Sequence, residues 1–148
     1  MATDDPEGLA IFEKIKHSAK KQIDNKDIIL LTVENSILVN ALQRSSAVIL
    51  QKSLREGFGL TVTEALWKET PVVTTNVGGI PLQIQDGVNG YLLEPNDIDG
   101  FTDRIVEILR NPRLAKELGK KGKETVKEKF LITRVLTDYL DLLNSISQ

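Results

Sequence analysis

One stretch of the chain decides its fold, and it reads Arg55-Glu56-Gly57-Phe58-Gly59-Leu60-Thr61-Val62-Thr63-Glu64. A short apolar run at 47–51 precedes it and is typical of a strand, whereas the residues from Leu60 onward favour a helix. The two glycines therefore fall at a strand-to-helix junction. Open α/β sheets bind their ligands at such junctions, so we expect a binding site here.

Strand-type runs alternate with helical patterns before and after this stretch. The expected strands are 28–33, 47–51, 71–75 and 91–93, and the expected helical segments are 6–22, 34–45, 60–69, 81–84, 98–111, 112–129 and 132–145. Parallel strands joined by helices imply right-handed crossovers. The sequence thus predicts an α/β fold: an incomplete doubly wound, Rossmann-like parallel sheet with helices on both faces and C-terminal helices.

Composition excludes several classes of function. The 148 residues have the length of one domain, and 19 Lys plus Arg against 21 Asp plus Glu give a net charge of −2, which argues against a nucleic-acid partner. The chain has no cysteine and a single histidine, His17, so it offers neither a thiolate nucleophile nor a histidine metal cluster. We expect a cytoplasmic protein, because neither a membrane span nor a signal segment is evident.

The residue types around the glycine turn suit a nucleotide sugar. Glycines let the backbone approach a ligand, and the N–H groups at the helix start, Leu60 and Thr61, suit a diphosphate. Glu64, one turn into the helix, can accept two hydrogen bonds from a vicinal diol such as a ribose. The alternative is a tight connection with no ligand. For the later turn at Gly78-Gly79, that plain structural interpretation is the stronger one.

Taken together, the motifs resemble the C-terminal, donor-binding domain of retaining GT-B glycosyltransferases of the group 1, E-x7-E type. The resemblance is carried by Glu56 and Glu64 with the Glu-Gly-Phe-Gly-Leu run, by Val77-Gly78-Gly79-Ile80-Pro81, and by Asp86-Gly87-Val88-Asn89-Gly90-Tyr91-Leu92. Within that family, 1–8 and 55–65 are most similar to trehalose synthases that use nucleotide sugars. The resemblance implies a hexosyltransferase of carbohydrate metabolism that moves glucose from a nucleotide-diphosphate sugar to an acceptor, with glucose as the acceptor where trehalose is the product.

The resemblance also implies roles for individual residues. Glu56 would be the catalytic residue beside the donor hexose, stabilising positive charge at the anomeric carbon. Donor-binding groups would be Gly57, Phe58, Gly59, Leu60, Thr61 and Glu64, with the N–H groups of Phe58 and Gly59 on sugar hydroxyls, those of Leu60 and Thr61 on the diphosphate, and Glu64 on the ribose. The resemblance implies front-face transfer with retention, in which the leaving phosphate helps to deprotonate the acceptor, and it implies neither a metal nor a cofactor.

Some parts of the family's pattern are not matched. Many relatives have an acid directly after the Gly-Gly-Ile-Pro segment, where this chain has Leu82-Gln83. The Arg and Lys that clamp the diphosphate belong to a first strand-loop-helix unit that nothing here matches. We therefore expect 1–148 to be a single, N-terminally truncated GT-B C-terminal domain that is inactive alone and lacks its N-terminal partner domain.

The truncation has a consequence for the sheet. In the family's strand order, 3-2-1-4-5-6, two strands would be missing between 28–33 and 47–51, so we expect self-association, a strand swap or a rearranged strand neighbour. Two other functions stay open. One is a non-catalytic nucleotide-sugar or phosphate-binding module, and the other is a GT-B nucleotide-sugar epimerase, for which His17 is poorly placed as an acid/base group.

Overall fold

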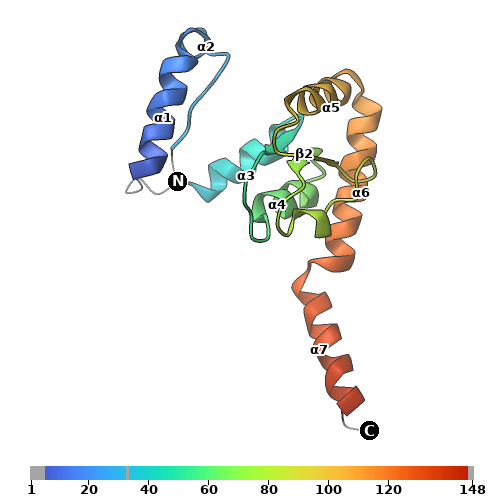
Figure 1. The fold of residues 1–148 in the computed structure, drawn as a ribbon. Helices are drawn as coiled ribbons and strands as arrows, with labels where there is room; N and C mark the ends of the chain where they lie inside the picture. The colour runs from blue at the N-terminus through green and yellow to red at the C-terminus, as the bar shows by residue number, and fades with distance from the viewer. Residues whose placement is uncertain (1–5, 33, 147–148) are drawn as a thin grey trace. The chain divides into compact units, whose positions relative to one another are not determined.

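The computed structural model describes residues 6–32 and 34–146, which form two compact units, Met1–Val39 and Asn40–Gln148. Each unit is described by itself. The first contains α1 (Pro6–Ser18) and α2 (Lys20–Asp24), so the helix expected over 6–22 is divided at Ala19. The helix α3 (Ser36–Ser45) carries the chain from the first unit into the second (Figure 1).

The strand expected at 28–33 is wrong for the residues that the structure describes. Residues 28–32 form no strand, and Val33 lies outside the described residues. Ile29 and Leu31 are 73% and 52% exposed, so the apolar run is not buried between layers. An apolar run becomes a strand only where a neighbouring strand supplies hydrogen bonds, and no described strand pairs with this one.

The second unit is built on a parallel sheet with the order β1-β2-β3. Its strands are β1 (Ile49–Gln51), β2 (Val72–Thr75) and β3 (Tyr91–Leu93). Ile49 is opposite Val72, and Val73 is opposite Tyr91. The strands expected at 47–51, 71–75 and 91–93 are confirmed, the first two in shorter form. Within the described sheet β1 is an edge strand.

The helices of the second unit follow the expected segments closely. They are α4 (Leu60–Trp67), the 3₁₀ turn η1 (Ile80–Leu82), α5 (Ile98–Arg110), α6 (Pro112–Lys129) and α7 (Ile132–Ile146). Asp97 caps α5 by accepting a hydrogen bond from Gly100 N–H at 2.9 Å, and Asn111 caps α6 in the same way from Leu114 N–H at 3.1 Å. Such caps satisfy N–H groups that a helix start leaves unpaired.

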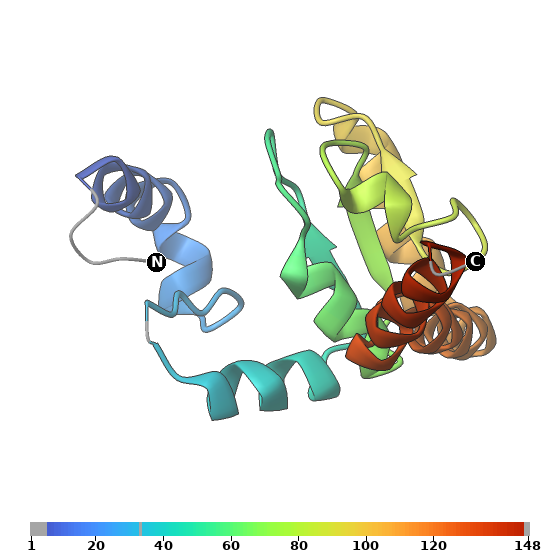
Figure 2. The same cartoon turned by 90° about the horizontal axis from the view of Figure 1, so that it is seen from below.

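Helices cover both faces of the sheet, as predicted (Figure 2). Val72 and Val73 are adjacent on β2 and point to opposite faces, so each belongs to a different core. The core on the α4 side contains Val62, Ala65, Leu66, Val72, Ile80, Ile84 and Val126, and the core on the α5 side contains Val73, Tyr91, Phe101, Ile108 and Leu118. The helix α6 contributes to both cores through Leu118 and Val126, and so ties them together.

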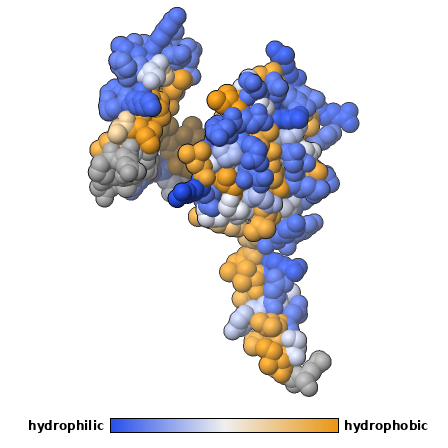
Figure 3. Space-filling view, viewed as in Figure 1, coloured by the Kyte–Doolittle hydropathy of each residue, from blue (hydrophilic) through white to orange (hydrophobic). Residues whose placement is uncertain are grey.

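The last helix, α7, presents an apolar surface to solvent (Figure 3). Its exposed side chains include Ile132, Val135, Leu136, Tyr139, Leu140, Leu142 and Ile146. None of the helices in 6–32 and 34–146 has the length and apolar character needed to cross a bilayer. Polar side chains such as Arg134, Asp138 and Asp141 alternate with these apolar ones at helical spacing, so α7 is an amphipathic helix.

The core on the α5 side can be tested with two neighbouring residues. Ile108 is 2% exposed and Leu109 is 54% exposed. We expect Ile108→Ala to lower the free energy of unfolding by about 2–5 kcal/mol, because it removes buried methyl groups and leaves a cavity. Leu109→Ala is the matched control and should change that free energy by less than about 1 kcal/mol. Urea unfolding followed by circular dichroism measures both, and equal losses would contradict this assignment of the core.

Candidate functional site

Two glycine turns meet at the carboxyl edge of the sheet. The first, 57–59, follows β1, and the second, 76–79, follows β2. Gly79 N–H donates to the carbonyl of Gly57 at 2.8 Å. Gly78 has a φ of +56°, and a Cβ placed on it would lie 1.7 Å from the carbonyl oxygen of Glu56. The second turn is thus more than a plain connection, because its bare backbone supports the first turn.

Glu56 lies at the start of the first turn, and it is partly buried. Its Oε2 accepts hydrogen bonds from Gln51 Nε2 at 3.1 Å and from Ser53 Oγ at 3.4 Å, and its Oε1 accepts one from Gly57 N–H at 3.1 Å. Ser53 is itself tied to β2, since Thr75 Oγ1 donates to its carbonyl at 2.7 Å. The Glu56 carboxylate is therefore held in place by residues at the C-terminal ends of β1 and β2.

The helix α4 begins at this turn without a side-chain cap. Gly59 is its N-cap residue, with a φ of 89°, and the Gly59 carbonyl accepts from Val62 N–H at 2.9 Å. The N–H groups of residues 58–61 donate to no acceptor within the described part of the chain. Unpaired N–H groups at a helix start, together with the helix dipole, favour a negatively charged ligand.

Glu64 lies one turn further along α4, with its side chain exposed. Its Oε2 accepts a hydrogen bond from Gln43 Nε2 at 2.8 Å, and Lys68 Nζ donates to Gln43 Oε1 at 2.8 Å. Gln43 is 5% exposed, and its carbonyl accepts from Thr70 Oγ1 at 2.6 Å. One carboxylate oxygen is thus fixed by a buried amide, and the hydrogen bonds described for Glu64 leave its Oε1 open to another donor.

Every candidate residue named from the sequence therefore falls on one continuous segment, from Glu56 to Glu64, and lies at one edge of the sheet. The Phe58 ring packs edge-on against Phe130, with 5.6 Å between ring centroids, which anchors the turn to the end of α6. Sequence reasoning missed the amide side chains that hold the segment. These are Gln43, Gln51 and Gln83. One signal in the sequence could have identified Gln83: it is a polar residue between Ile80 and Ile84, two apolar residues that the fold buries.

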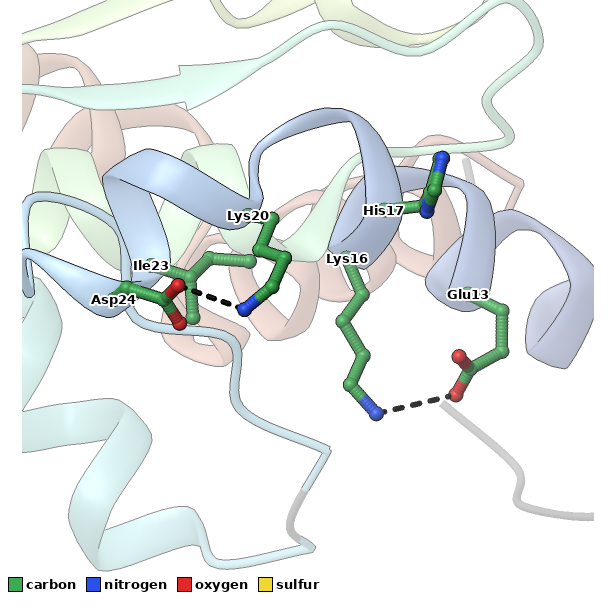
Figure 4. A pocket seen from close by; sticks show the side chains of 6 residues that line it. All are labelled: Glu13, Lys16, His17, Lys20, Ile23 and Asp24. Atoms are coloured by element: carbon green, nitrogen blue, oxygen red, sulfur yellow. Dashed lines mark hydrogen bonds and ion pairs between the residues drawn. The ribbon is translucent and has the colours of Figure 1, made fainter.

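A separate pocket of about 260 Å³ lies in the first unit, between α1 and α2 (Figure 4). The charged side chains around it pair with each other: Lys20 Nζ lies 2.8 Å from Asp24 Oδ2, and Lys16 Nζ lies 3.7 Å from Glu13 Oε1. His17, which also lines this pocket, is exposed. Such pairs on helix surfaces are ordinary solvated contacts, and they assign no chemistry to the pocket.

The groups with shifted pKa values lie away from the glycine turn. A hydrogen bond from Arg104 lowers the pKa of Glu107, and burial raises the pKa of Tyr91. Tyr91 and Arg104 are stacked, with 4.8 Å between the guanidinium and the ring, so this cluster joins β3 to α5. Among the described residues no group of three or more His, Asp or Glu side chains is placed to hold a metal ion.

Comparison with known proteins identifies the family. The family model described as "Glycosyl transferases group 1" matches residues 11–125. A trehalose synthase from Thermococcus litoralis is 51% identical over 145 residues, which are 98% of this chain and 35% of that protein. The chain therefore spans about a third of the length of the trehalose synthases that it matches.

Solved structures agree with this result. The C-terminal domain of a group 1 glycosyl transferase from Francisella tularensis is 26% identical, with a TM-score of 0.77 over 86% of this chain and 66% of that chain. S. aureus TarM, solved with fondaparinux, α-GlcNAc-glycerol and UDP, is 28% identical, with a TM-score of 0.70 over 88% of this chain and 27% of that chain. The chain belongs to the group 1 glycosyltransferases and has their Rossmann-like GT-B fold.

Proposed function

We propose that this chain is the donor-binding part of a retaining hexosyltransferase and that residues 56–64 hold a nucleotide-diphosphate sugar. The observation that carries the proposal is the row of N–H groups at 58–61, which lack acceptors among the described residues and lie between two carboxylates, Glu56 and Glu64. A diphosphate joins a sugar to a ribose, so one ligand presents hydroxyls, negative charge and a diol in the same order. The segment presents a carboxylate, a row of N–H donors and a second carboxylate in the matching order.

The diphosphate is assigned to the start of α4. The N–H groups of Leu60 and Thr61 lie at the positive end of the helix dipole, and no side chain caps them. In the transfer reaction negative charge grows on the leaving phosphate, and fixed N–H donors stabilise it without reorganising. The N–H groups of Phe58 and Gly59 are assigned to sugar hydroxyls.

Glu56 is assigned to the sugar ring. Its carboxylate is held by Gln51, Ser53 and the N–H of Gly57, so it keeps a defined position beside the turn. A fixed negative charge stabilises the positive charge that develops at the anomeric carbon as the bond to the phosphate breaks. Front-face attack by the acceptor, with the leaving phosphate taking the acceptor proton, retains the anomeric configuration, and these steps require no metal.

Glu64 is assigned to the ribose. Gln43 holds one oxygen of the Glu64 carboxylate, and the other oxygen can accept a hydrogen bond from a ribose hydroxyl.

The relatives support the choice of ligand: the T. litoralis protein is named a trehalose synthase, and TarM was solved with UDP. We infer that the hexose is glucose and that the acceptor is also glucose. The chain spans 35% of such a relative, and we propose that it is inactive alone.

A segment exchange tests the assignment of Glu56. This chain replaces the matching third of the T. litoralis trehalose synthase, and the chimera is assayed for trehalose formation from nucleotide-diphosphate glucose and glucose. We expect the chimera to be active and Glu56→Ala to lower its kcat by about 100-fold or more, because charge stabilisation in the transition state is lost. Glu117→Ala, an exposed change on α6, is the matched control and should leave kcat unchanged. An unchanged kcat in Glu56→Ala would overturn the assignment.

The KM for the donor distinguishes the role of Glu64 from that of Glu56, whose loss is expected to lower kcat. Glu64→Ala removes hydrogen bonds between a carboxylate and the ribose, each of which contributes about 1.5–3 kcal/mol. We expect a rise in the KM for the donor of about 10-fold or more in the chimera, with a smaller change in kcat. A fall in kcat at constant KM would contradict this role.

The isolated chain discriminates between a transferase fragment and a binding module. We expect calorimetry to show weak binding of UDP-glucose, at about millimolar dissociation constants. The family resemblance implies that the Arg and Lys that clamp the diphosphate, and the acceptor site, are not within these 148 residues. Binding at micromolar dissociation constants by the chain alone would favour the non-catalytic module instead.

A further inference from the structure

We propose that Gln83 is a positioning residue that aims the N–H groups of the glycine turn at the sugar donor. This inference rests on the proposed function. Gln83 follows η1 in sequence and is 1% exposed. It contacts the turn from the protein side, so it would touch neither the donor nor the acceptor, and its effect would pass through the backbone.

The Gln83 amide uses both of its ends. Its Oε1 accepts a hydrogen bond from Thr63 Oγ1 at 2.6 Å, and its Nε2 donates to the carbonyls of Phe58 and, at 3.5 Å, Gly59. Only the NH₂ group can donate to two carbonyls, and only the oxygen can accept from the hydroxyl. The reverse orientation would place the amide oxygen against two carbonyl oxygens, so the contacts select one orientation.

Because each peptide unit is rigid, holding its carbonyl group also fixes the direction of its N–H group. In a trans peptide the C=O and the following N–H point in opposite directions. Holding the carbonyls of Phe58 and Gly59 toward Gln83 therefore turns the N–H groups of Gly59 and Leu60 away from the core. These N–H groups are among those that find no acceptor in the described residues. Gln83 thus orients two of the donors assigned to the nucleotide sugar.

A second buried amide fixes Gln83 in turn. Asn89 is 2% exposed, and its Nδ2 donates to the Gln83 carbonyl at 2.9 Å and to Thr125 Oγ1 on α6 at 3.0 Å. Its Oδ1 accepts from Gln85 N–H at 2.7 Å. The turn is therefore connected to α6 by a continuous chain of hydrogen bonds. A buried polar side chain with every hydrogen bond satisfied restricts its neighbours to one arrangement.

The sharpest test replaces the amide by a carboxyl group of the same size. Gln83→Glu keeps the volume, but an ionised carboxylate cannot donate to the two carbonyls, whereas the protonated acid can donate to one. We expect ¹⁵N relaxation of the ligand-free chain to give order parameters near 0.85 for amides 58–61 in the wild type, and below about 0.6 in Gln83→Glu at pH 8. Order should return as the pH falls and the carboxyl group protonates.

Two further variants complete the design. Gln85→Glu introduces the same carboxyl group two positions away at an exposed site, and its order parameters should match the wild type at every pH. Thr63→Val removes the hydroxyl that holds Gln83 Oε1, and it should loosen amides 58–61 without any pH dependence. This variant keeps the test available where Gln83→Glu fails to fold.

Donor binding supplies the second readout. Calorimetry of the chimera with the T. litoralis trehalose synthase should show an affinity for UDP-glucose about tenfold weaker in Gln83→Glu than in the wild-type chimera at pH 8, with recovery at acidic pH. Ordered amides at pH 8 in both Gln83→Glu and Thr63→Val would overturn the positioning role. If the chimera with wild-type Gln83 binds no UDP-glucose while the amides of the chain respond as expected, the proposed function fails and the structural role of Gln83 stands.

Discussion

The site depends on a contact between two stretches of bare backbone. The turn after β2 lies against the turn after β1 so closely that a Cβ on Gly78 or Gly79 would meet a carbonyl oxygen at 1.7 Å or 2.5 Å. Backbone cannot move aside as a flexible side chain can, so glycine is required at both positions. This contact sets where Glu56 and the start of α4 lie, because the carbonyls of Glu56 and Gly57 form the contact surface.

Neutral amides hold the groups around this contact. Gln51 donates to Glu56, Gln43 donates to Glu64, and Gln83 donates to the carbonyls of the turn between them. Hydrogen bonds from neutral donors fix the two carboxylates and leave their negative charge in place. In the proposed function this leaves one carboxylate for the developing charge on the sugar and the other for the ribose, with the N–H groups between them free for the sugar hydroxyls and the diphosphate.

Much of the fold could be predicted from the sequence because its signals are local. Apolar runs marked β1, β2 and β3, and helical patterns in the sequence marked α5 and α6. The expected strand at 28–33 had an equally clear apolar run, but a strand also needs a partner, and none is present among the described residues. The hydrophobic pattern of a segment indicates which of its side chains can be buried. Whether the segment forms a strand also depends on whether another strand lies beside it in the fold.

The sequence by itself determined the order of the elements and the segment from Glu56 to Glu64, because a strand, a glycine turn and a helix follow each other within a few residues. Only the tertiary structure decided how that segment is held. Gln43, Gln83 and Gly78 are distant from it along the chain, and they act through hydrogen bonds and close contacts that exist only after the strands have paired. Local pattern carries no information about such contacts, since it cannot say which distant residues will face each other.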